Sequence, residues 1–274
     1  MNAQVGFRGR AWFHALTGNN SVMDGDPGSV LTADAELGNQ SARFLCVVPS
    51  AQGRFPCARR GEVGLEEAYT LAMRVREVIG QDEKEKKRPI STIVDVKSQA
   101  YGRREETAAI FMAAAAAADA YASARMKGHP VITLVVRQAI SGGFLTHGYH
   151  ANRILAFDDS GVIIHAMHKE AAARITLRSV ADLERLGHEI APMSYDIRDY
   201  ARLGLLHKLL HVDNPDNPSK ATLAQVQKEL IDAIADARVG SKDLSNHFTS
   251  EGALQIRKAG LAARAQMERE WVTA

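Results

Sequence analysis

Two short segments of the chain combine glycine with residues that are suited to bind a negatively charged group. They are Tyr101-Gly102-Arg103-Arg104 and Ser141-Gly142-Gly143. Each follows an apolar run rich in β-branched residues, 91–96 in the first case and 131–136 in the second, and each leads into helix-forming residues. Backbone N–H groups at the start of a helix have no acceptor within it, and the helix dipole favours negative charge there. Two such turns side by side would direct N–H groups of Tyr101-Gly102 and Gly142-Gly143 at one oxygen, which is the arrangement that stabilises the oxyanion of acyl chemistry.

A nucleotide-binding loop is the first alternative for glycines that follow a strand. Gly142, Gly143 and Gly148 do not fit the pattern G-x-G-x-x-G, and the sequence contains no phosphate-binding loop of the form G-x-x-x-x-G-K-[ST]. The glycines could instead serve only to let a strand and a helix pack closely. The sequence therefore leaves close packing and an oxyanion hole as the two interpretations.

Ser141 and His147 are the side chains near the second turn that could take part in chemistry. Ser141 lacks the G-x-S-x-G context of a serine nucleophile and an evident base, so we expect it to cap the following helix or to contact substrate. His147 is a candidate for substrate contact, with a histidine satisfied inside the fold as the alternative. His207 and His211 have the i, i+4 spacing of helical metal ligands but lack the glutamate of H-E-x-x-H, so no zinc site is expected.

Arg103 and Arg104 open the predicted helix after Gly102, where two cations oppose the helix dipole. Glu105 and Glu106 follow at once and could pair with them. We predict that the arginines bind a carboxylate of a partner or a phosphate of a carrier arm, with a local ion pair as the alternative.

The composition is that of an ordinary globular protein. The chain has 274 residues, of which 46% are hydrophobic and 24% charged, and its net charge is +2. So small a charge gives no support for binding to nucleic acid or to a membrane surface. No apolar run reaches membrane-spanning length, and residues 1–8 do not resemble a signal peptide. Cys46 and Cys57 lack the spacing of a metal site or a disulfide, so a cytoplasmic location fits best.

The elements that must position the two turns alternate between strands and helices, which predicts the α/β class. Strands are expected at 29–35, 43–48, 91–96, 131–136, 153–157 and 162–165, and helices at 65–79, 103–126, 143–151, 169–177, 220–237 and 251–271. Residues 212–219, rich in proline and asparagine, form the clearest linker. We therefore expect a domain over 1–211 with a helical N-terminal arm, and a C-terminal helical region over 220–274 that packs on the domain or on a partner.

The sequence resembles the carboxyltransferase branch of the crotonase superfamily and, more closely, the gamma subunits of biotin-independent malonate decarboxylases. The matched segments include 8–13, 33–38, 43–49, 61–67, 98–106, 141–148 and 193–197. The most specific of them is 99–106, whereas Lys97 and the uninterrupted alanine run 113–118 are less typical.

This resemblance implies a spiral of β-β-α units in which Tyr101, Gly102, Gly142 and Gly143 form one backbone oxyanion hole. It implies a related beta subunit, with the active site between the two chains, and an acyl carrier protein and an acyl carrier transferase as further subunits. The substrate would be malonate held as a thioester on the CoA-derived arm of the carrier protein, and the products acetyl thioester and carbon dioxide. No cofactor would be bound directly, and biotin would not be needed.

Two other functions compete with this expectation. One is the alpha-type subunit of a biotin-dependent acyl-CoA carboxyltransferase, which shares the fold but usually has a Pro-Gly turn where this chain runs from Gly102 directly into Arg103. The other is a non-catalytic scaffold that docks the carrier protein while the partner performs the chemistry.

Overall fold

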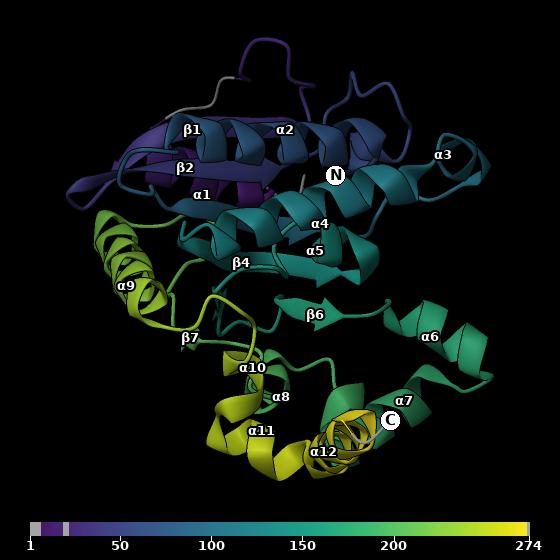
Figure 1. Cartoon of the computed structure of the whole chain (residues 1–274). Helices are drawn as coiled ribbons and strands as arrows, with labels where there is room; N and C mark the ends of the chain where they lie inside the picture. Colours follow the sequence, from purple (N-terminus) through teal and green to yellow (C-terminus); the bar gives the residue numbers. More distant parts are fainter. Residues whose placement is uncertain (1–6, 19–21, 273–274) are drawn as a thin grey trace.

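A sheet of seven strands forms the centre of the molecule in the computed structural model, which describes residues 7–18 and 22–272 (Figure 1). Its strands follow the order β1-β2-β3-β4-β5-β7, and β6 pairs with β4 outside this path. β1 and β2 form an antiparallel hairpin, and all other pairs are parallel. The strands are β1 (Val30–Leu37), β2 (Gln40–Val47), β3 (Ile90–Val96), β4 (Val131–Ile140), β5 (Arg153–Phe157), β6 (Ile163–His165) and β7 (Lys208–Leu210).

β4 is the strand that positions the candidate site. Its first half pairs with β5, from Ile132 to Val135, and its last three residues pair with β6. On its other side it pairs with β3 until Val96 lies opposite Ala139. The strands β3, β4 and β6 therefore end at one edge of the sheet, because parallel strands share their direction.

Helices cover the sheet on both faces. The helices of the described residues are α1 (Arg8–Thr17), α2 (Leu65–Gln81), α3 (Arg103–Thr107), α4 (Ile110–Met126), α5 (Ser141–Thr146), α6 (Lys169–Thr176), α7 (Val180–Glu189), α8 (Ile197–Arg202), α9 (Lys220–Val239), α10 (Asn246–Thr249), α11 (Glu251–Ile256) and α12 (Lys258–Val272). Of these, α1, α2, α4, α5, α8 and α9 pack against strands of the sheet. α2 and α4 lie side by side (Figure 1). Ala117, Ala120 and Ala124 of α4 are buried, so one face of this helix is part of the core, whereas the other residues of the alanine run 113–118 are partly or fully exposed.

Most predicted strands and helices are confirmed, and four stretches differ. The helix expected over 103–126 is two helices, because Ala109 adopts a left-handed conformation with φ 61°. The helix expected over 143–151 ends at Thr146, and Gly148 follows with φ 126°. Residues 251–271 divide at Arg257. Residues 207–211 contain strand β7, so His207 and His211 do not share a helix face.

The segment between β7 and α9 packs against the N-terminal helix. The indole nitrogen of Trp12 donates to the carbonyl of Pro215 at 2.8 Å, and Arg8 pairs with Asp216 at 2.7 Å. α9 beyond it lies in the main core, with Val226 and Leu230 fully buried. α12 lies at the other extreme, since the side chains described along it are almost all exposed. Among the described residues no helix could span a membrane.

Candidate functional site

The two strand-to-helix junctions touch at Gly143. A β-carbon on this residue would lie 2.9 Å from the backbone nitrogen of Gln99 and closer still to the carbonyl of Ser98. Real β-carbons essentially never approach another atom so closely, so only glycine fits without movement of the backbone. Gly143 is thus the point at which the turn after β4 meets the loop after β3.

Gly142 faces the same loop with more room. A β-carbon there would lie 3.0 Å from the amide group of the Gln99 side chain, which can rotate away. Gly142 and Gly143 belong to the first turn of α5, where backbone N–H groups have no acceptor within the helix. Two backbone donors therefore lie directly beside the loop 98–102.

The first junction approaches this point through Ser98 and Gln99, whereas Tyr101 and Gly102 lie further along the loop. Val63 holds the loop in place: its N–H donates to the carbonyl of Ser98 at 3.0 Å, and its carbonyl accepts from Ala100 at 2.8 Å. Gly102 then begins α3 in an extended conformation, with φ 166°. Sequence reasoning missed Ser98 and Gln99 as contacts of the second turn, because the glycines reveal that a close neighbour exists but not which residue it is.

Arg103 and Arg104 are exposed, and no acidic group among the described residues forms an ion pair with either of them. Glu105, which the sequence offered as a local partner, is buried instead, with its carboxylate turned toward Gly102. The local ion pair that sequence analysis held as the alternative is therefore absent from the described chain. Both guanidinium groups are available to an external anion.

Exposed apolar side chains occur on the loop before these arginines and on the helices α4 and α5. Tyr101, Phe111 and Met112 are each more than 60% exposed, and Leu145 of α5 is 52% exposed. Large apolar groups clustered on a surface mark an interaction site more often than chance exposure does.

Ser141 occupies a strained position between β4 and α5. Its φ is 58°, and it begins the helix without capping it, since Ile140 is the N-cap and makes no side-chain hydrogen bond. The expected capping role is therefore wrong. Ser141 instead lines a pocket of about 330 Å³ together with Gly142, Phe144 and His165.

His147 belongs to the interior and not to this pocket. Its ring is fully buried, with Nδ1 3.0 Å from the hydroxyl of Tyr121 and Nε2 3.2 Å from the carbonyl of Ile93. Burial lowers its pKa from 6.5 to about 4, so the ring is neutral near pH 7. Direct contact of His147 with substrate, which the sequence suggested, is thus contradicted, because both nitrogens are used within the fold.

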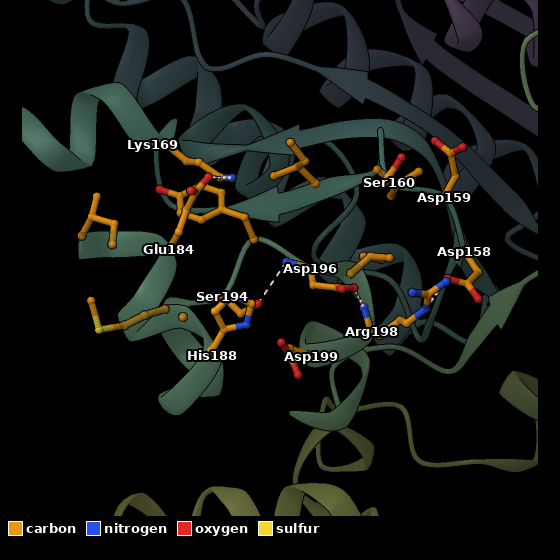
Figure 2. Close-up of a pocket in the computed structure, with 17 residues that line it drawn as sticks. Asp158, Asp159, Ser160, Lys169, Glu184, His188, Ser194, Asp196, Arg198 and Asp199 are labelled. Atoms are coloured by element: carbon orange, nitrogen blue, oxygen red, sulfur yellow. Dashed lines mark hydrogen bonds and ion pairs between the residues drawn. The ribbon is translucent and has the colours of Figure 1, made fainter. Parts of the chain in front are cut away.

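A second, polar pocket of about 400 Å³ lies below β6 between α7 and α8 (Figure 2). Two ion pairs lie among its charged lining residues: Lys169 pairs with Glu184 at 2.7 Å and Arg198 with Asp158 at 2.8 Å. Asp196 accepts the backbone N–H of Arg198 at the start of α8. These interactions brace α6, α7 and α8, and the pocket shares no lining residue with the one at Ser141. No group of three or more potential metal ligands occurs in the described ranges.

The arrangement of these parts matches a known family. A model of malonate decarboxylase gamma subunits matches residues 58–267. The chain belongs to the malonate decarboxylase gamma-subunit family. The gamma subunit has the crotonase fold that the sequence led us to expect.

Solved structures agree with this assignment. The chain is 48% identical to a chain of a Pseudomonas malonate decarboxylase hetero-tetramer in complex with coenzyme A, covering 96% of this chain and 99% of that one, with a TM-score of 0.91. A Pseudomonas malonate decarboxylase MdcD-MdcE hetero-dimer gives the same identity and coverage, with a TM-score of 0.89. The transcarboxylase 12S core, at 18% identity and a TM-score of 0.64 over 86% of this chain and 42% of that one, shares the fold alone.

A relative that is similar over most of the chain is a carboxyltransferase by name. The malonyl-S-ACP:biotin-protein carboxyltransferase of Malonomonas rubra is 32% identical over 231 residues, which are 81% of this chain and 78% of that protein.

Proposed function

We propose that this gamma subunit completes, together with a beta-type partner, a site that decarboxylates a malonyl thioester carried on an acyl carrier protein. The observation that carries the proposal is the contact of Gly143 with Ser98 and Gln99, which brings the two junctions together. The products would be acetyl thioester and carbon dioxide, and an acyl carrier transferase would reload the carrier with malonate. We expect the complex to work in the cytoplasm.

The chemistry requires donors and no acid–base residue at the bond that breaks. Loss of carbon dioxide from a malonyl thioester leaves an electron pair that spreads onto the thioester oxygen as an enolate. Fixed N–H donors lower the barrier to such a charge, each by about 3 kcal/mol in well-studied cases. In our proposal Gly142 and Gly143 supply two donors, and Tyr101 and Gly102 supply the remainder when the loop 98–102 is held against its partner.

The exposed surface next to the turns suits a partner subunit and a carrier. Tyr101, Phe111, Met112 and Leu145 would be covered by the beta-type chain, since their exposure is costly in water. Arg103 and Arg104, free of acidic partners in the described chain, would hold phosphate groups of the CoA-derived arm. Ser141 would contact the substrate from the pocket beside α5.

Reconstitution tests this proposal. The chain is co-expressed with the beta-type subunit encoded beside it, and the purified complex is assayed for release of carbon dioxide from a malonyl-loaded carrier protein. We expect activity from the complex and at most a trace from either chain alone. A chain that forms no complex with a crotonase-like partner would contradict the shared site.

A biotin-dependent carboxyl transfer is the second candidate, and the Malonomonas rubra relative is the observation that favours it. Excess avidin distinguishes the two functions, because it sequesters biotin and its protein conjugates. Decarboxylation that continues in the presence of avidin supports the biotin-independent reaction. Decarboxylation that stops in the presence of avidin supports the biotin-dependent carboxyl transfer.

A further inference from the structure

Ser141 has a backbone conformation that neither its element nor its hydrogen bonds explain. Three non-glycine residues in the described ranges have positive φ: Ala109, Ser141 and Leu177. Ala109 directly follows Ala108, the C-cap of α3, and Leu177 is the C-cap of α6, so both lie where a left-handed residue commonly ends a helix. Ser141 instead follows β4 directly and is the first residue of α5. A sharp strand-to-helix turn with strained φ is how acyl-transfer enzymes expose a nucleophilic serine.

His165 lies across from this turn. β6 runs parallel to the end of β4 with His165 paired to Ile140, the residue immediately before Ser141. Both Ser141 and His165 line the pocket of about 330 Å³. The sequence did not reveal this neighbour, because the pairing of β6 with β4 skips β5 and brings together residues 24 positions apart.

The imidazole of His165 is held in a fixed orientation. Its Nδ1 lies 3.0 Å from the carbonyl of Met167 and 3.3 Å from the backbone nitrogen of the same residue, and its ring stacks on Tyr195 with centroids 3.9 Å apart and an interplanar angle of 18°. In the tautomer that carries its proton on Nδ1 and donates it to that carbonyl, the shorter of the two contacts, the lone pair lies on Nε2, the nitrogen that a general base uses. Burial lowers the pKa of His165, so the ring is a neutral base near pH 7.

The remaining pocket walls suit a small acyl group. Phe144, Leu145 and Ile164 supply apolar surface, and Tyr149 and Tyr200 also line the pocket. The volume of about 330 Å³ is at the lower end of small-molecule sites. A short acyl chain would therefore place its carbonyl at the Ser141 side of the pocket.

We propose that Ser141 and His165 form a nucleophile–base pair that cleaves short-chain acyl esters and thioesters, an activity separate from decarboxylation. The Ser141 oxygen attacks the acyl carbonyl carbon, His165 Nε2 accepts the hydroxyl proton, and that proton passes to the departing alcohol or thiol. An acyl-serine remains. Water then attacks it, with His165 again taking and returning a proton, which releases the carboxylic acid and restores the serine.

The test uses the full-length chain with p-nitrophenyl acetate and with a fluorophosphonate probe, followed by peptide mapping. We expect the probe on Ser141, and ester hydrolysis that Ser141→Ala and His165→Gln each reduce by at least about 100-fold. Ser160→Ala and His188→Gln are matched controls, because both residues are exposed and lie in the other pocket. Their hydrolysis should equal that of the unmodified chain.

Ser141→Gly guards against a purely structural effect. Glycine accepts a φ of 58° without strain, so this variant keeps the fold and still lacks the nucleophile. Hydrolysis that survives in Ser141→Gly, or a probe that labels another residue or none, overturns the proposal. A complex that decarboxylates malonyl thioester but takes no label would refute this inference alone and leave the proposed function standing.

Discussion

The hydroxyl of Tyr121 lies 3.0 Å from Nδ1 of His147, and both side chains are fully buried between α4 and the sheet. Because the Nε2 atom faces the carbonyl of Ile93, this histidine joins a helix to a strand through two hydrogen bonds. Its neutrality is a condition of the fold, since a buried imidazolium would have no carboxylate to pair with.

This relationship makes stability depend on pH. The pKa of His147 is about 4 in the folded chain and near 6.5 when unfolded, so the unfolded state binds more protons between these values. The contribution of His147 to the free energy of unfolding should therefore be fully present above pH 6.5. The free energy of unfolding should fall by about 3 kcal/mol as the pH decreases toward 4. Urea denaturation at pH 7.5, 6 and 5 measures this slope.

A substitution isolates the contribution of His147. His147→Gln should lower stability at pH 7.5, because a buried hydrogen bond is lost, and should flatten the slope. His211→Gln is the control, since that side chain is 82% exposed. His247, whose pKa burial also lowers to about 4, will leave part of the slope in place. An unchanged slope in His147→Gln would contradict the prediction.

Gly143 and Gly142 form a matched pair for testing the candidate oxyanion hole. Gly143→Ala places its β-carbon against the backbone of Ser98 and Gln99 and so must push the junctions apart. We expect kcat of the reconstituted decarboxylase to fall by about 100-fold or more. Gly142→Ala meets only the movable Gln99 side chain, so its loss should stay below about tenfold. Equal effects of the two substitutions would show that contact between the junctions does not control activity.

The paired arginines should affect binding more than turnover. Arg103→Ala and Arg104→Ala each remove an exposed cation without an ion-pair partner in the described chain, so stability should change by less than about 0.5 kcal/mol. We expect KM for the carrier-bound thioester to rise by about tenfold for each at low salt, and by less at high salt, where the attraction of the arginine for a phosphate is already screened. Arg76→Ala is the control, because Arg76 is exposed but pairs with Asp119 on the neighbouring helix. A drop in kcat with unchanged KM would argue against arm binding.

In the C-terminal region, α9 should be required for folding, whereas α12 should not be. A chain ending at residue 211 loses Val226, Leu230 and Ile234 from the core, at a cost of about 5 kcal/mol or more, which is comparable to the stability of a whole domain. A chain ending at 257 loses only α12, whose side chains are largely exposed. Circular dichroism and thermal melting should show the first truncation unfolded and the second folded. A folded 1–211 fragment would refute the role of α9.

Sequence patterns predicted the elements that local chemistry determines. The strands expected at 29–35 and 43–48 are the two strands of the β1–β2 hairpin, and β5 at Arg153–Phe157 has the bounds that were expected. The break at Ala109 was missed because alanine favours a continuous helix, and only the tertiary structure imposes its left-handed conformation. Strand β7 was mistaken for a helix because three residues are too few to show a period.

The site was predictable from the sequence where it depends on local residues, and not where it depends on contacts between distant residues. Both glycine turns were recognisable, because glycine after an apolar strand has few physical explanations. The interior position of His147 was one of the two interpretations that the sequence offered, but its partners Tyr121 and Ile93 were not predictable, since they are distant in sequence. The proximity of His165 to Ser141 was not predictable for the same reason. It depends on the pairing of β6 with β4 and not with β5, the strand that precedes β6 in the sequence.

The division of β4 between two neighbours constrains how this protein can change during evolution. The pairing with β5 sets the register of residues 132–135 of β4, and the pairing with β6 sets the register of residues 138–140. Val136 and Arg137 are the residues of β4 between these two paired segments. An insertion or deletion of one residue there would reverse the facing of every later side chain and carry the glycine turn away from the loop after β3. We expect natural relatives to vary in length at the surface loops and to keep the length of β4 constant.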